Sequence, residues 1–241
     1  MDKHKLIVDS VVVRFGQKTV LSGGYITSET GMVTGLLGRN GAGKSCMFRA
    51  LMGGLRVENV MVSIDEKPID RQTIGRYIKY LPQGRLIPEG MQLHRAFDLY
   101  GVNYWTFVNR VPKYSRHYDS PIYELSGGEA RLAELYLVLL SDAPFYILDE
   151  PFTQVDPVSI DEVKALIRER SRDHGIIVTD HNYDALSSVA DILFVIADGY
   201  TNPVRCREDL PPRGRRPWRH RRCGGAVRAR RARSWRYRRY C

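Results

Sequence analysis

Residues 31–45 read "GMVTGLLGRNGAGKS" and join a short apolar strand, a glycine-rich loop and the first residues of a helix. Gly38 and Gly43 lie five positions apart and are followed directly by Lys44 and Ser45. Glycines let backbone N–H groups close around phosphate oxygens, the helix N-terminus adds positive potential, and the lysine neutralises β- and γ-phosphates. This pattern predicts a phosphate-binding loop in which Ser45 also binds Mg²⁺. The predicted nucleotide-contacting residues of the loop are Gly38, Arg39, Asn40, Gly41, Ala42, Gly43, Lys44, Ser45 and Cys46.

Strands and helices alternate around this loop, which predicts an α/β fold. Expected strands occupy residues 5–15, 19–27, 31–37, 59–64, 77–81, 145–150, 175–180 and 191–197, with a turn at 65–68. Expected helices occupy residues 44–53, 91–101, 127–141 and 158–172. Because strand periodicity is lost after residue 83, we expect residues 84–141 to be a helical insertion in the α/β core.

Two acidic residues end the apolar strand "FYILDE" at 145–150. Ligands of open α/β sheets bind beyond the carboxyl ends of the strands. An aspartate placed there, Asp149, can hold Mg²⁺ directly or through water, and the neighbouring Glu150 can polarise an attacking water molecule. Two ordinary acids at a strand end are the alternative, but the neighbouring phosphate-binding loop favours a role in hydrolysis.

The stretch "LSGGE" at 125–129 opens the predicted helix 127–141. A capping box accounts for Ser126 and Glu129, because serine at the N-cap and glutamate three positions later satisfy each other's backbone N–H groups. The capping box does not account for Gly127 and Gly128, since each glycine in a helix costs about 1 kcal/mol relative to alanine. The paired glycines therefore predict that another group approaches this backbone closely, and the helix N-terminus favours an anion.

The order of these motifs resembles the ATP-binding cassette (ABC) ATPases. "GRNGAGKS" at 38–45, "LPQ" at 81–83, "LSGGE" at 125–129, "FYILDE" at 145–150 and "TDH" at 179–181 cover about four-fifths of the chain. The resemblance implies a P-loop nucleotide-hydrolase core of ABC type with an antiparallel β subdomain and an inserted helical subdomain, together comprising residues 1–204. It also implies an Mg²⁺-dependent ATPase that works as a homo- or heterodimer of two cassettes.

The resemblance assigns roles to individual residues. Ser126, Gly127 and Gly128 would cap the γ-phosphate of the ATP held by the partner cassette. Glu150 would be the catalytic base, assisted by Lys44, Gln83 and His181, with Ser45, Gln83 and Asp149 holding Mg²⁺. Phe15 would stack on adenine. Asp156 would lie in a loop that crosses the dimer, although aspartate before proline is equally typical of a helix start.

The helical insertion implies a partner. In the family this subdomain binds a coupling helix of an integral membrane permease, which would place the protein on the cytoplasmic face of a membrane. Aromatic and aliphatic residues in 84–105 suit either such a groove or the subdomain's own core. The longest apolar runs in the chain are far shorter than the ~20 residues of a membrane span. The four cysteines are far apart and predict neither a disulfide framework nor a metal site.

Net charge divides the chain at residue 205. Residues 1–204 carry a net charge of −3, whereas residues 205–241 carry +13 from 15 arginines, no lysine and two acids. Such a tail is typical of a nucleic-acid or acidic-lipid arm. The abrupt change also fits a solvated tail or a reading-frame slip. Because these alternatives leave the tail without an assigned function, we expect no specific nucleic-acid partner.

Two other function classes stay open at this point. A soluble ABC-type ATPase of cofactor assembly, DNA repair or translation would share these motifs. However, the 81 positions between Lys44 and Leu125 contain no coiled-coil heptads, and the chain holds one cassette rather than two. A DNA-binding protein would depend on the basic tail. The favoured interpretation is the ATP-hydrolysing subunit of an ABC transporter.

Overall fold

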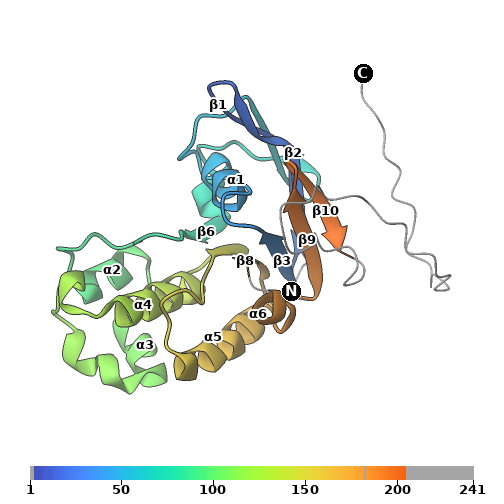
Figure 1. The fold of residues 1–241 in the computed structure, drawn as a ribbon. Helices are drawn as coiled ribbons and strands as arrows, with labels where there is room; N and C mark the ends of the chain where they lie inside the picture. Colours follow the sequence, from blue (N-terminus) through green and yellow to red (C-terminus); the bar gives the residue numbers. More distant parts are fainter. Residues whose placement is uncertain (1–2, 182, 205–241) are drawn as a thin grey trace.

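The computed structural model describes residues 3–181 and 183–204, which form one mixed sheet with helices around it (Figure 1). The strands are β1 (Lys5–Phe15), β2 (Lys18–Glu29), β3 (Val33–Gly38), β4 (Asn59–Ile64), β5 (Lys67–Pro68), β6 (Ile78–Leu81), β7 (Phe145–Asp149), β8 (Gly175–Asp180), β9 (Ile192–Ala197) and β10 (Tyr200–Val204). The α-helices are α1 (Lys44–Leu51), α2 (Leu93–Leu99), α3 (Tyr104–Arg110), α4 (Gly127–Leu140), α5 (Pro157–Arg170) and α6 (Tyr183–Ser187). Three short 3₁₀ helices are η1 (Ile74–Arg76), η2 (Pro112–His117) and η3 (Ile122–Glu124).

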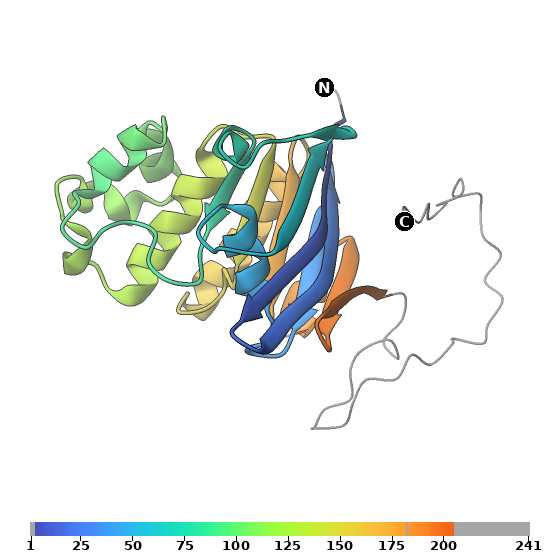
Figure 2. The ribbon, with the colours of Figure 1, turned by 90° about the horizontal axis from the view of Figure 1, so that it is seen from above.

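The sheet has a parallel and an antiparallel half. Its strand order is β5-β4-β1-β2-β10-β9-β3-β8-β7-β6, and β9, β3, β8, β7 and β6 pair in parallel. Strands β5, β4, β1 and β2 pair antiparallel, and the hairpin β9–β10 joins the halves. Viewed from above, the blue antiparallel strands and the green helical region lie at opposite ends of the molecule (Figure 2). The predicted α/β fold with its antiparallel region is confirmed.

Strand β7 separates two hydrophobic cores, which explains its uninterrupted apolar sequence. Phe145 and Ile147 pack in a core with α1 and the antiparallel strands. Tyr146 and Leu148 point to the other side, into a core shared with α4 and α5. Because side chains alternate across a strand, a strand covered on both faces must be apolar at every position.

Parallel register brings four strand ends to one edge of the sheet. Leu37 of β3 pairs with Asp180 of β8, and Asp149 of β7 pairs with Thr179 of β8. Leu81 of β6 pairs with Leu148 of β7. The segments that follow these strands therefore emerge side by side, and they carry the predicted phosphate loop, Gln83, Glu150 and His181.

The helical region is more subdivided than the sequence indicates. The expected helix 91–101 is found as α2 and the expected helix 127–141 as α4, but α3, η2 and η3 were not predicted. Helix α4 is buried along most of its length and contacts α3, α5 and β6. One hydrophobic cluster continues from Leu93 and Phe97 of α2 to Leu148 of β7.

Several boundaries differ from the prediction. Residues 67–68, expected in a turn, form the edge strand β5 after a turn in which Asp65 and Glu66 have φ of 52° and 65°. Strand β10 was missed because "YTNPV" contains a proline and lacks apolar alternation, and helix α6 because its five residues are too few to show a helical period. The Arg-rich tail 205–241 lies outside the described residues.

Candidate functional site

The phosphate-binding loop closes the gap between β3 and α1. Its lysine, Lys44, is 5% exposed and donates from Nζ to the backbone oxygen of Gly38 at 2.7 Å. Gly43 has φ of +108°, and a Cβ at this position would lie 3.0 Å from Val20 of β2. Both the backbone conformation and the packing thus require glycine. Arg39, Asn40 and Gly41 are exposed at the rim of the loop.

Asp149 ends β7 and is fully buried. Thr179 Oγ1 donates to its Oδ1 at 2.6 Å, and Tyr80 hydroxyl donates to its Oδ2 at 3.2 Å. Burial, followed by the charge of Asp149, raises the pKa of Tyr80, so the phenol keeps its proton and acts as a donor. Both carboxylate oxygens therefore have a fixed orientation.

Three of the predicted site residues surround the carboxylate of Glu150. Gln83 Nε2 donates to its Oε2 at 2.9 Å, and Lys44 Nζ lies 3.4 Å from its Oε1. His181 Nδ1 lies 3.9 Å from the same Oε1 and 3.4 Å from Asp180 Oδ1, and its ring is half-exposed. The structure thus brings Lys44, Gln83, Asp149, Glu150 and His181 together.

The other predicted nucleotide contacts lie around this centre. Ser45 is half-buried at the start of α1. Phe15 is 50% exposed at the end of β1, opposite Lys18 of the hairpin. Since Val20 of the same hairpin packs against Gly43, the Phe15 ring lies on an element that touches the phosphate loop.

The stretch 125–129 forms the expected capping box. Ser126 is the N-cap of α4, its hydroxyl accepts from the Glu129 N–H at 3.2 Å, and Glu129 Oε2 accepts from the Ser126 N–H at 3.0 Å. The Ser126 hydroxyl also donates to Glu129 Oε2 at 2.8 Å, and this hydrogen bond, followed by the one from the Ser126 N–H, is the main reason that the pKa of Glu129 is lowered. Ser126 and Gly127 are exposed.

The two glycines of this stretch have different surroundings. A Cβ on Gly128 would lie 2.7 Å from the backbone oxygen of Gln154 in the same chain. The predicted close approach is therefore made by the loop between β7 and α5. A Cβ on Gly127 would meet nothing closer than 3.6 Å, so packing within the chain does not require this glycine.

Asp156 is the N-cap of α5 and accepts a hydrogen bond from the Ser159 N–H at 3.0 Å. Pro157 occupies the first turn, as expected for a helix start. The helix-start interpretation thus accounts for Asp156 within the chain.

Sequence reasoning missed four residues of the site. Thr179 and Tyr80 hold Asp149, and a buried ion pair between Arg131 and Glu134 lies beneath Glu150. One signal was present: Arg131 and Glu134 are charged residues in the otherwise apolar stretch "RLAELYLVLL" at 131–140, which marks a buried polar contact.

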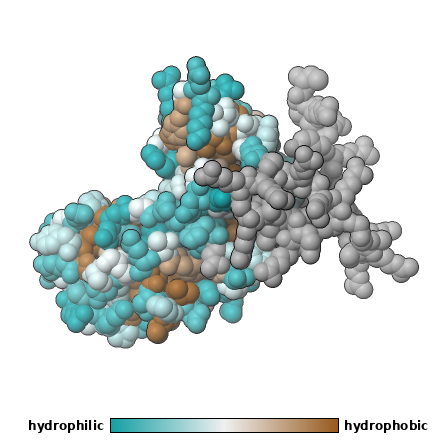
Figure 3. All heavy atoms as spheres, in the orientation of Figure 1, coloured by the Kyte–Doolittle hydropathy of each residue, from teal (hydrophilic) through white to brown (hydrophobic). Residues whose placement is uncertain are grey.

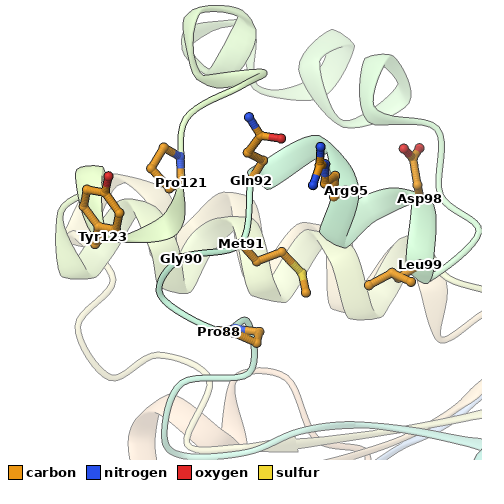
Figure 4. Close-up of a pocket in the computed structure, with 9 residues that line it drawn as sticks. All are labelled: Pro88, Gly90, Met91, Gln92, Arg95, Asp98, Leu99, Pro121 and Tyr123. Carbon is orange, nitrogen blue, oxygen red and sulfur yellow. The ribbon is translucent and has the colours of Figure 1, made fainter.

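A groove of about 930 Å³ opens on the helical region (Figure 4). Met91 and Leu99 lie side by side along it, Tyr123 stands at its other end, and Arg95 and Asp98 extend from α2 at the rim (Figure 4). Leu99 is 73% and Tyr123 66% exposed. Figure 3 shows a hydrophobic strip at this helical end among mostly polar surface.

Comparison with known proteins decides the family. The family model described as ABC transporter matches residues 21–153, more than half of the chain. The chain belongs to the ABC transporter family. It is 31% identical over 192 residues to the lipopolysaccharide export system ATP-binding protein LptB of Escherichia coli K12, covering 73% of this chain and 79% of LptB. An uncharacterised ABC transporter ATP-binding protein of Rhizobium meliloti is 29% identical over 209 residues, covering 80% and 77%.

Solved structures agree on the fold. The ATP-binding subunit of an ABC transporter superposes with a TM-score of 0.72 at 22% identity, over 83% of this chain and 90% of that one. This ABC protein is the ATP-hydrolysing subunit of a transporter, and the soluble repair, translation or assembly ATPase is not favoured. No helix in the described part of the chain is both long and apolar enough to cross a membrane.

Proposed function

We propose that the residues around Glu150 bind and hydrolyse the ATP that this subunit uses. The convergence of Lys44, Gln83 and His181 on one buried carboxylate supports this assignment. The loop 38–45 would hold the phosphates and Phe15 the adenine ring. When phosphate oxygens occupy the loop, Lys44 binds them in place of Glu150. The Glu150 carboxylate is then free to act on water.

Glu150 is then the general base. It accepts a proton from the attacking water, while Gln83 and His181 orient that water toward the γ-phosphate. Burial of Glu150 favours this role because it limits access of bulk water to the carboxylate. The reaction converts ATP and water to ADP and phosphate.

The residues at this edge fit Mg²⁺. No three His, Cys, Asp or Glu side chains in residues 3–181 and 183–204 gather into a protein-only metal cage. Mg²⁺ is usually held by one or two carboxylates, water and substrate phosphates, so one aspartate with hydroxyl and amide neighbours is sufficient. Asp149, Ser45 and Gln83 would hold the ion. The hydroxyls of Thr179 and Tyr80 would orient the Asp149 carboxylate for this role. The ion would neutralise phosphate charge.

Two cassettes would pair head to tail, with Ser126 and Gly127 of one capping the γ-phosphate bound by the other. The exposed N-terminus of α4 supports this arrangement, as does the absence of any packing reason within the described chain for Gly127. The subunit would lie on the cytoplasmic face of a membrane, where an integral membrane permease would place a coupling helix in the groove lined by Met91, Leu99 and Tyr123. Residues 1–204 would form the ATPase domain, in which residues 84–141 are the subdomain that binds the permease. Residues 205–241 would be a separate tail.

The substitution Glu150→Gln tests the proposed base. It keeps the size and hydrogen bonding of the side chain but removes the proton acceptor, so turnover should fall about 10²- to 10⁴-fold while ATP binding persists. ATP-loaded protein should accumulate as a dimer in size-exclusion chromatography with light scattering. Normal turnover by the variant would rule out Glu150 as the base.

A further inference from the structure

Helix α4 carries an ion pair that the reaction described above does not use. Arg131 is 4% and Glu134 1% exposed, and Arg131 Nη1 lies 3.7 Å from Glu134 Oε2. Removing two charges from water is costly, and a hydrophobic pair of similar volume is often at least as stable. A structural role alone is thus a weak explanation for these charges at this position.

Arg131 reaches backbone atoms of both segments that carry the proposed catalytic residues. Its Nη2 donates to the backbone oxygens of Asp149 at 2.8 Å and Glu150 at 3.2 Å. Its Nη1 donates to the backbone oxygen of Pro82, next to Gln83, at 2.7 Å. One guanidinium thus fixes the spacing between Gln83 and Glu150.

Glu134 extends the same connection toward the groove. Its Oε1 accepts hydrogen bonds from the backbone N–H groups of Leu86 at 2.8 Å and Ile87 at 3.1 Å. The next residue, Pro88, lines the groove (Figure 4). The pair therefore joins the groove wall, the Gln83 segment and the end of β7.

The backbone of Glu150 needs such support. Its φ is +49°, in the left-handed region that residues other than glycine rarely adopt. Strained conformations of this kind persist only when their surroundings fix them from several sides. Thr179 Oγ1 accepts from the Glu150 N–H at 2.9 Å, and Arg131 binds the Glu150 oxygen on the other side of the same residue.

We infer that Arg131, oriented by Glu134, is a positioning residue for ATP hydrolysis that holds the Glu150 backbone in register with Gln83 and with the groove wall. This inference rests on the proposed role of Glu150 as base. A positioning role of Arg131 differs from a purely structural role in its effect on the kinetic constants. Loss of the clamp changes kcat and leaves KM for ATP unchanged, because the phosphate loop makes none of these contacts.

The double variant Arg131→Met/Glu134→Gln tests the inference in the full-length chain. It removes both charges together, so neither is left buried and unpaired, and the glutamine oxygen can still accept from Leu86 and Ile87. We expect cooperative unfolding as in the wild type, KM for ATP within about twofold, and kcat reduced roughly 30-fold, within the ~10²-fold that a 1 Å misplacement costs.

Arg170→Met is the matched control. Arg170 also donates from Nη2 to a buried partner, the Tyr146 hydroxyl, at 2.8 Å, but it lies at the other end of β7 from Glu150. We expect this variant to keep its kcat. Wild-type kcat in the folded double variant, or equal loss of kcat in both variants, would overturn the inference.

Two further variants keep the result interpretable. If the double variant does not fold, the variant Arg131→Lys tests the inference instead. A lysine keeps the charge, but its single ammonium cannot bind the three backbone oxygens that Arg131 holds. We expect kcat to fall about tenfold, and a wild-type kcat would overturn the inference. Normal turnover by Glu150→Gln would instead refute the proposed base, so the two failures are distinguishable.

Discussion

Two loops of this ABC subunit, residues 38–45 and 125–129, place glycines at the N-terminus of a helix, but their surroundings are opposite. In the first loop, Lys44 is buried and lies between the Gly38 oxygen and Glu150 of its own chain. In the second loop, Ser126 is exposed and its polar groups are used by the capping box. The same local pattern thus forms a site within the chain at residues 38–45. At residues 125–129 it leaves the N-terminus of the helix exposed to solvent.

The largest effect is expected from Lys44→Ala in the first loop. The buried ammonium is the only lysine among the described residues that lies against Glu150, so its loss removes the charge that would meet the phosphates. Turnover should fall at least about 10²-fold, and ATP affinity should fall with it. Equilibrium binding of a fluorescent ATP analogue and steady-state phosphate release measure the two quantities. Lys79→Ala removes a lysine of β6 that lies outside the site, where its Nζ donates to the Gly75 oxygen at 3.4 Å, and this variant should behave as wild type.

The second loop is tested by a pair of alanine substitutions at adjacent glycines. Gly128→Ala would place a Cβ 2.7 Å from the Gln154 oxygen, so we expect a loss of about 1–3 kcal/mol in the free energy of unfolding. Gly127→Ala meets only ordinary contacts and should leave that free energy nearly unchanged.

Hydrolysis should nevertheless fall about tenfold in Gly127→Ala if a second cassette's phosphate approaches this backbone. Urea unfolding and steady-state turnover on both variants separate the two effects. If Gly127→Ala hydrolyses ATP normally, the two loops would not share a nucleotide.

The groove is the third point of contrast, because we propose that it binds a different partner, a membrane permease. Leu99→Asp should reduce capture of a membrane permease in detergent about tenfold, since it buries a carboxylate against a docking helix. Basal turnover of the isolated chain should not change. Met61→Asp replaces a similarly exposed hydrophobic residue on β4 and serves as the control. Equal capture by both variants would move the docking site elsewhere.

Local motifs predicted the first loop better than the regions formed by distant segments. The phosphate loop, Asp149 and Glu150 are each specified by a few consecutive residues on elements of regular periodicity. Arg131 and Tyr80 have no such motif, and the motif "TDH" at 179–181 assigned a role only to His181. The roles of Arg131, Tyr80 and Thr179 depend on which strands become neighbours in the sheet. Helix α6, with five residues, is too short to show a helical period, and β10 contains a proline, which argues against a strand.

The glycine pair shows the same limit. The sequence predicted a close approach at Gly127 and Gly128, but it could not show that Gln154 of the same chain approaches Gly128 alone. Only the packing of the loop after β7 against α4 separates the two positions.

The smallest expected effect concerns His174, far from both loops. Its Nδ1 lies 2.8 Å from the Ala143 oxygen and donates to it in the neutral ring, and burial is the main cause that lowers the pKa of His174 below 6.5. The unfolded state therefore binds a proton at a higher pH than the folded state. The contribution to stability is complete above pH 6.5 and is lost as the pH falls through the folded-state pKa.

Replacing this ring removes that dependence. Urea unfolding of the wild type and His174→Gln should show a steeper loss of stability in the wild type between pH 7 and 5. Equal slopes would show that the folded protein does not depress the pKa of His174.

Mixing two inactive variants tests most directly whether the second loop acts on the partner's nucleotide. Lys44→Ala lacks a functional first loop, and Gly127→Asp places a carboxylate where the γ-phosphate would approach while remaining favourable at a helix N-terminus. Half of the randomly paired dimers in an equal mixture would hold one intact composite site, so we predict turnover of about a quarter of the wild-type value. If the mixture is no more active than the two variants measured separately, the loops do not complete each other across a dimer.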